Sequence, residues 1–293
     1  MKKSKLARLI AAICCFAMLL TACSSNQTSA ESGGDGSTTA DSEKKVLTYA
    51  IGAETTDLST LYMNNSLYCT SKLVYENLVD FDNGEIVPGL AESWEYNDDQ
   101  TELTFHLRQG VTFHNGEPFN AEAVKTNLEH KQSNPSFYSL KGITDIQEIE
   151  IVDDYTITLH YDHPFYAYLQ DFCWPDVNPM SAPEYIIPGD FQTISGVAGT
   201  GPYIYDEYVA GEYTRFVRNE DYWGETPYWD EVIVKYIPDS TSRLQALQTG
   251  EIDMIYGGTL LTYEEYDQAL AMDGIDGQMA EKDTRVQVIT TNA

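Results

Sequence analysis

The stretch that most constrains the fold is 89–124, which reads GLAESWEYNDDQTELTFHLRQGVTFHNGEPFNAEAV. Apolar and polar residues alternate in it twice, around Trp94 and Tyr96 and again from Leu103 to Leu107, and this pattern is typical of half-buried strands. The polar run 97–99 between them has the composition of a turn. The sequence therefore predicts a hairpin whose apolar face rests on a core.

The second half of the same stretch predicts a turn and a helix start. Gly110 breaks the second strand, and Asn115-Gly116 has the composition of a tight turn. Asn120 is a good N-cap for a helix that begins at Ala121, and Glu122 suits the positive end of the helix dipole. We therefore expect a capped helix directly after the hairpin.

The rest of the folded part, from Val46 onward, mixes strands and helices without a strict βαβ rhythm, which favours an α/β class with a mixed sheet and α+β elements. Strands are predicted at 46–52, 149–161 (a hairpin turning at Asp153-Asp154), 203–208, 213–218, 232–237 and 252–256. Helices are predicted at about 67–78, 165–172 and 241–249, the last capped by Asp239 or Ser240 and ended by Gly250. No internal repeat is visible.

Three further motifs accompany the opening stretch in the same order along the chain. They are GTGPY at 199–203, VRNEDYWG at 217–224 and IPDSTSRLQALQTGEIDMIYG at 237–257. Together with 89–124 they closely resemble the family 5 extracellular solute-binding proteins, the peptide and nickel receptors of ABC importers. The last blocks resemble the nickel-type branch most.

This resemblance implies a lobe of a type II periplasmic-binding-protein fold over 46–283, with an inserted subdomain at about 82–195. Residues 284–293 would begin the crossover to a second lobe. Family members run to about 500 residues, so we expect the second lobe to be missing from this chain. Because such receptors enclose the ligand between two lobes, we expect the chain alone to bind ligand weakly, which calorimetry would check.

The N-terminus predicts an extracytoplasmic address. Basic residues at 2–8 precede an apolar run of twelve, Leu9 to Leu20, which is short for a bilayer span and typical of a secretory signal. Leu20-Thr21-Ala22-Cys23 resembles a bacterial lipobox, so 1–22 would be a lipoprotein signal peptide and Cys23 the lipidated residue anchoring the protein to the cell membrane. The alternative is an ordinary secretory signal with a chance cysteine. Residues 23–45, rich in small and polar residues, would form a flexible linker.

Charge and cysteine usage exclude several partners. Removal of residues 1–22 would take four positive charges from the formal net charge of −29 and leave −33, so no basic stripe exists for nucleic acid. Cys69 and Cys173 could form one disulfide or remain two buried free thiols. No C-x-x-C or H-E-x-x-H spacing occurs, and we expect no metal site and no cofactor.

No catalytic constellation is evident. The adjacent carboxylates, such as Asp98-Asp99 and Glu264-Glu265, lie in turn-like or helix-surface contexts and are interpreted as solvated. No serine sits in a G-x-S-x-G elbow. His160 and His163 are interpreted as surface residues, and Gly199-Thr200-Gly201 as a tight turn that needs glycine for positive φ rather than a phosphate loop.

Candidate ligand contacts come from the resemblance and from the aromatic residues, of which 21 tyrosines and four tryptophans are many for this length. The family implies three cleft segments, 64–68, 136–140 and 174–178, and their candidate residues are Asn64, Asn65, Tyr68, Phe137, Tyr138, Trp174 and Asp176. Nickel-type members that bind a metal chelate carry arginines in the second and third segments, and this chain carries none there. Asp176 could instead meet a cationic group such as a peptide amino terminus.

The sequence thus predicts a non-enzymatic, membrane-anchored lipoprotein that binds a small solute and delivers it to ABC permease subunits. An oligopeptide or dipeptide is the favoured ligand, and chelated nickel or another metal complex is the alternative. A secreted hydrolase and a non-transporting sensor lipoprotein are hypotheses from other classes.

Overall fold

The computed structural model describes residues 44–55, 58, 60, 69–82, 84–164, 167–174, 178–191, 195–257 and 260–278. The predicted signal peptide, all but the end of the predicted linker and the predicted crossover at 284–293 lie outside these residues. So do the candidate residues Cys23, Asn64, Asn65, Tyr68 and Asp176.

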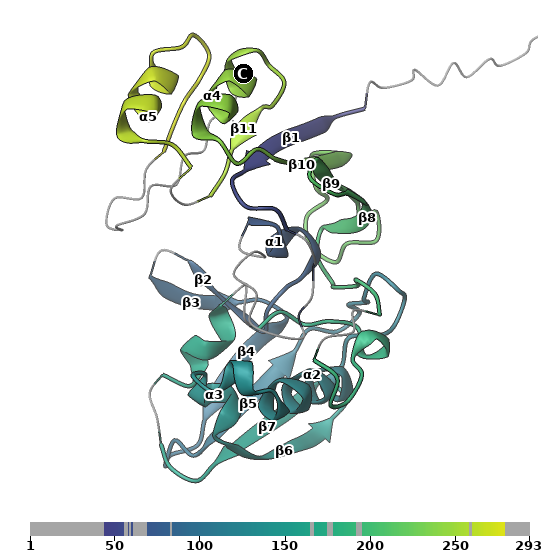
Figure 1. The fold of residues 1–293 in the computed structure, drawn as a ribbon. Coiled ribbons are helices and arrows are strands. Elements are labelled where there is room, and N and C mark those ends of the chain that lie inside the picture. The colour runs from purple at the N-terminus through teal and green to yellow at the C-terminus, as the bar shows by residue number, and fades with distance from the viewer. Residues whose placement is uncertain are drawn as a thin grey trace, which may run out of the picture. The chain divides into compact units, whose positions relative to one another are not determined.

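One part of the fold is a five-stranded mixed sheet (Figure 1). Its strands, in spatial order, are β11 (Met254–Ile255), β1 (Val46–Ile51), β10 (Glu231–Tyr236), β9 (Tyr213–Arg218) and β8 (Tyr203–Val209). β1 pairs in parallel with β10 and β11, whereas β8, β9 and β10 pair antiparallel. The mixed sheet confirms the predicted fold class.

Two helices pack beside the β11 edge of this sheet, α4 (Ser240–Gln248) and α5 (Tyr263–Leu270). Asp239 caps α4 by accepting from the Ser242 N–H at 2.8 Å, and Gly250 follows it in the left-handed region with φ +73°. Both features confirm the predicted start and stop of this helix. Leu247 and Ala269 join the two helices to Ile255 in one apolar cluster.

The other large part is a four-stranded antiparallel sheet covered on one face by a helix (Figure 1). The strands are β4 (Ala91–Tyr96), β5 (Glu102–Leu107), β7 (Thr156–Tyr161) and β6 (Ile146–Asp153), in that spatial order. The helix is α2 (Ala121–Ser133), and its Val124 and Leu128 share one core with Phe105. The hairpin predicted from Trp94 to Leu107 is confirmed as β4 and β5, and the one predicted at 149–161 is confirmed as β6 and β7.

Asn120 caps α2 as the sequence predicts. Its extended backbone precedes the helix, and its side-chain oxygen accepts from the Ala123 N–H at 2.9 Å. Gly116, in the preceding Asn115-Gly116 turn, has φ +89°, a conformation that a side chain would strain. The helix cap and the tight turn predicted from 89–124 are therefore both present.

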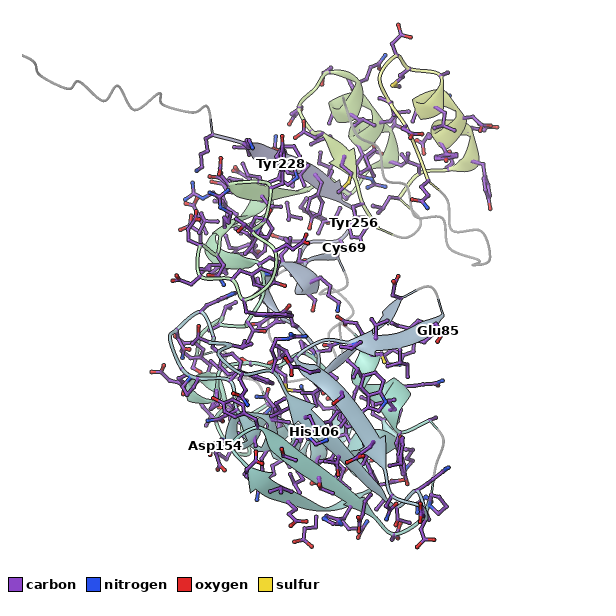
Figure 2. All side chains as sticks on the ribbon, turned by 180° about the vertical axis from the view of Figure 1, so that it is seen from behind. Cys69, Glu85, His106, Asp154, Tyr228 and Tyr256 are labelled. Carbon is purple, nitrogen blue, oxygen red and sulfur yellow. The ribbon has the colours of Figure 1, made fainter. Side chains whose placement is uncertain are left out.

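The outer face of the four-stranded sheet carries polar cross-strand pairs. The Thr104 and Thr158 hydroxyls lie 2.8 Å apart, and His160 Nε2 lies 2.9 Å from a Glu150 carboxylate oxygen. Figure 2, which views the sheet from behind, shows His106 on this face. This placement agrees with the interpretation of His160 as a surface residue.

Between the two sheets in the chain lie a helical turn α1 (Ser71–Val74) and the hairpin β2 (Val79–Asp82) and β3 (Glu85–Pro88). The helix predicted over about 67–78 is wrong in its second half. Tyr75 takes extended backbone angles (φ −118°, ψ 152°) and its hydroxyl donates to the Leu58 carbonyl at 2.7 Å. Burial of this ring overrides helix propensity and turns the chain into β2.

The predicted helix at 165–172 is also only partly right. The described residues there form η3 (Leu169–Cys173), a 3₁₀ helix, and a second short 3₁₀ helix, η4, covers Pro183–Tyr185. No helix in the described part of the chain is long and apolar enough to cross a membrane.

Candidate functional site

Three of the predicted ligand contacts lie within the described residues, and they differ in exposure. Phe137 is fully buried and forms a small apolar cluster with Leu140 and Ile143. Tyr138 and Trp174, in contrast, are 63% and 56% exposed. In this structure Phe137 is a packing residue, and Tyr138 and Trp174 are the exposed members of the three.

The segment that carries Tyr138 is fixed by local hydrogen bonds. Asn134 ends α2, and its side-chain oxygen accepts from the Ser136 N–H at 2.9 Å, which starts η2 (Pro135–Phe137). The Leu140 N–H then donates to the Phe137 carbonyl at 2.9 Å. With Phe137 buried beneath it, this turn presents Tyr138 to solvent.

Trp174 directly follows η3, which packs closely against α3 (Lys141–Thr144). The Gly142 N–H donates to the Asp171 carboxylate at 2.7 Å, and the Tyr161 hydroxyl donates to the Gly142 carbonyl at 2.8 Å. A Cβ at Gly142 would lie 2.4 Å from the Tyr168 carbonyl oxygen, so only glycine fits. Tyr138 therefore lies three residues before α3 and Trp174 directly follows η3, and these two elements pack on each other.

Strand β2 of the β2–β3 hairpin packs against η3. Lys72 of α1 forms an ion pair with Asp80 of β2. Phe81, next to Asp80, is mostly exposed, and Glu85 marks the far end of the hairpin in Figure 2. The hairpin that packs on η3 thus carries an exposed aromatic side chain, Phe81, next to the ion pair of Lys72 and Asp80.

Both cysteines in the described residues are free thiols. Burial raises the pKa of Cys69 and of Cys173 to about 11, which keeps both protonated at neutral pH. Cys69 donates to the Tyr256 carbonyl at 3.7 Å, and Figure 2 shows these two residues side by side. The structure therefore favours free thiols over the disulfide. Within the described ranges, no group of three or more His, Cys, Asp or Glu could hold a metal ion.

The motif glycines serve a different purpose from the one predicted. Gly199 and Gly201 do not have positive φ. A Cβ on Gly199 would lie 2.0 Å from the Val74 carbonyl oxygen, and one on Gly201 would lie 2.7 Å from it. The prediction of a positive-φ turn is wrong, and close approach of two backbones is the reason for both glycines.

A partly buried carboxylate joins the same motifs. Glu76, just after α1, accepts from the Thr200 hydroxyl, the Tyr222 hydroxyl and the Trp223 indole N–H, each at 2.8 Å. Burial raises the pKa of Glu76 above its usual value, and the three hydrogen bonds partly oppose this shift. The GTGPY and NEDYWG motifs are therefore scaffold, bound to each other through Glu76.

The chain matches the description "bacterial extracellular solute-binding proteins, family 5 Middle" over residues 85–293. The chain belongs to this family. The match begins in β3 and includes the four-stranded sheet, both candidate segments and the motifs around Glu76. The resemblance noted from the motifs is thus confirmed.

Several relatives of this solute-binding family are similar over long stretches. The nickel-binding periplasmic protein of Escherichia coli (strain K12) is 36% identical over 205 residues, which are 67% of this chain and 38% of that protein. The crystal structure of NikA from Brucella suis in complex with Fe(III)-EDTA has a TM-score of 0.76 at 31% identity, covering 81% of this chain and 49% of that one. DppA from Helicobacter pylori in complex with the peptide STSA has a TM-score of 0.68 at 28% identity, covering 80% and 50%.

These solute-binding neighbours are type II periplasmic binding proteins, and the chain covers part of their fold. The chain spans less than half the length of the nickel-binding relative and about half of the two structures. The relatives are transport proteins that act outside the cytoplasm.

Two residues of the family 5 chain that sequence reasoning missed are Glu76, which is partly buried, and Lys131, which is buried. Lys131 follows Val124 by seven positions and Asn127 by four, so it falls on the apolar face of α2. A lysine on the core side of an amphipathic helix is the signal that could have found it. Glu76 has no comparable signal, because its partners come from positions more than 120 residues away.

Proposed function

We propose that the chain is part of a substrate-binding protein of an ABC importer that captures a small peptide and delivers it to permease subunits. The observation that carries the proposal is the pair of exposed aromatic side chains at the segments implied by the family, Tyr138 just before α3 and Trp174 just after η3, where α3 and η3 pack on each other. Exposed Tyr and Trp offer rigid apolar area with a polar tip, as ligand contacts do. No covalent chemistry is required.

A peptide is favoured over a metal chelate by the side chains of the candidate segments. Neither 136–140 nor 174–178 contains arginine or lysine, whereas a chelator's carboxylates are best held by the planar fork of arginine. Asp176 offers a carboxylate for a peptide amino terminus. The similarity to a nickel-binding protein keeps a metal complex as the second candidate ligand.

The affinity for peptide should depend on Tyr138 and Trp174 but not on an exposed aromatic residue elsewhere. In the protein expressed from its whole gene, Trp174→Ala and Tyr138→Ala should each weaken peptide binding by about tenfold or more, the scale of a central aromatic contact. Tyr263→Ala is the matched control, because Tyr263 is equally exposed but lies on α5. Calorimetry with a panel of dipeptides measures the effect. Equal affinities for all three variants would contradict the assignment of the two segments.

We also propose that the protein is a lipoprotein, cut before Cys23 and held to the outer side of the cell membrane by a lipid on that cysteine. Cys23→Ala should then abolish incorporation of labelled palmitate and prevent cleavage before position 23, so that the protein keeps its signal peptide. Cys69→Ala, which removes a free thiol inside the folded part, is the control and should leave both readouts unchanged. Incorporation of labelled palmitate into Cys23→Ala at the level of the native protein would rule out lipidation of this cysteine.

A further inference from the structure

The segment after Trp174 is held against α2 by two polar side chains one helical turn apart. Lys131 Nζ donates to the Asn178 side-chain oxygen at 3.1 Å and to the Pro179 carbonyl at 2.6 Å. Asn127 donates to the Ser181 carbonyl at 2.8 Å, and its own oxygen accepts from the Ser181 N–H at 3.0 Å. The spacing of four places both side chains on the same helix face.

Asn178 carries the Lys131 contact on to Trp174. The Asn178 N–H donates to the Trp174 carbonyl at 2.9 Å, and its side-chain amide donates to the Asp171 carbonyl at 3.5 Å. Asn178 is fully buried, although Trp174, four residues earlier, is more than half exposed. The exposed tryptophan is thus tied at its backbone to a residue whose position depends on Lys131.

Burial of a lysine in an apolar core is costly, so this one requires an explanation. Only 1% of its surface is exposed, and its two partners are neutral oxygens. Burial lowers the pKa of Lys131 to about 7. In its neutral form the amine has two N–H donors, which match the two acceptors present.

We propose that Lys131 is a positioning residue for ligand recognition: through Asn178 it fixes the backbone of Trp174, so that this side chain is presented in one place. The inference rests on the proposed function, because it assigns Lys131 to the Trp174 contact. Asn127 has a separate task, which is to hold the next stretch, at Ser181, onto α2. Lys131 therefore holds the part of the segment next to Trp174, at Asn178 and Pro179. Asn127 holds the following part, at Ser181, onto α2.

The separate roles of Lys131 and Asn127 can be tested by residue-resolved hydrogen exchange on the whole protein without ligand. Lys131→Met keeps the length of the side chain and removes its donors, so exchange of the Asn178 amide should accelerate about tenfold while that of Ser181 stays within about twofold. Asn127→Ala, the matched control on the same face, should show the reverse pattern. Acrylamide quenching assigned to Trp174, by comparison with Trp174→Phe, should rise in Lys131→Met and not in Asn127→Ala.

Asn178→Ala provides a second route if Lys131→Met folds poorly. It removes the acceptor at the other end of the contact and leaves the Asn178 N–H in place, so Trp174 quenching should rise in the same way. Unchanged Trp174 quenching in both variants, or equal acceleration of Asn178 and Ser181 exchange in Lys131→Met, would overturn the inference. These readouts need no ligand. Failure of peptide binding would therefore refute the proposed function while leaving this result standing.

Discussion

Replacing Gly199 with alanine should lower the free energy of unfolding by about 3 kcal/mol or more, since a new methyl group would overlap a backbone atom that cannot move alone. The Cβ would lie 2.0 Å from the Val74 carbonyl oxygen and 2.6 Å from a ring carbon of Tyr75. The Val74 carbonyl also accepts from the Gly201 N–H at 2.9 Å. Relief of the clash would therefore break the contact that holds this motif to α1.

Gly110→Ala is the control for this prediction. Gly110 has φ +76° and no atom within 4 Å of an added Cβ, so alanine there should cost only about 1 kcal/mol of backbone strain. Urea denaturation of the two variants compares the costs. Equal losses would mean that the close approach to Val74 adds nothing to the cost of a side chain at Gly199.

Replacing Glu76 with alanine is the second large effect that we expect. Three donors in partly buried hydrogen bonds, on Thr200, Tyr222 and Trp223, would lose their acceptor, and the combined loss should be about 3 kcal/mol. Glu76→Gln should cost only about 1 kcal/mol, because its amide oxygen can still accept from Thr200 and Trp223. Trp223→Phe, which removes one donor, should also fall well below Glu76→Ala. If denaturant unfolding shows that Glu76→Ala loses less stability than Trp223→Phe, then Glu76 is not the common acceptor that stabilises these motifs.

The contribution of Glu76 to the free energy of unfolding should fall as pH rises. Burial raises the pKa of Glu76, so the folded state binds this proton more tightly than the unfolded state does. Its contribution to stability is therefore complete below the ordinary pKa of a glutamate and declines as pH rises through the raised value. Glu76→Gln should remove this decline, so the difference in stability between it and the native protein should shrink as pH rises from 4 toward neutrality.

Local signals in the sequence were sufficient for the elements whose stability is local. The Asn120 cap, the Gly116 turn, the alternation at Leu103 to Leu107 and the Asp239 cap each act within a few residues, and each appears where predicted. Tyr75 shows the limit of this reasoning. Its backbone is extended because its ring is buried and its hydroxyl reaches Leu58, and neither fact is visible in a helical pattern.

The candidate site was predictable only at the level of segments. The motifs located 136–140 and 174–178, but which side chain of each segment faces solvent depends on packing across elements. Phe137 is buried by Leu140 and Ile143, whereas its neighbour Tyr138 is exposed, and both are aromatic residues in one turn. The helix pattern places Lys131 on the core side of α2, but its partners lie 47 and 48 residues away and are not visible in that pattern.

The central claim is that this solute-binding chain belongs to a peptide receptor, and native mass spectrometry of the protein expressed from its whole gene tests it most directly. The protein should carry a co-purifying mass that denaturation releases and that fragments as a short peptide. The same mass should be lost from the Trp174→Ala variant and retained by Tyr263→Ala. A released metal chelate would contradict the peptide assignment, and turnover of added peptides by the purified protein would contradict a binding function altogether.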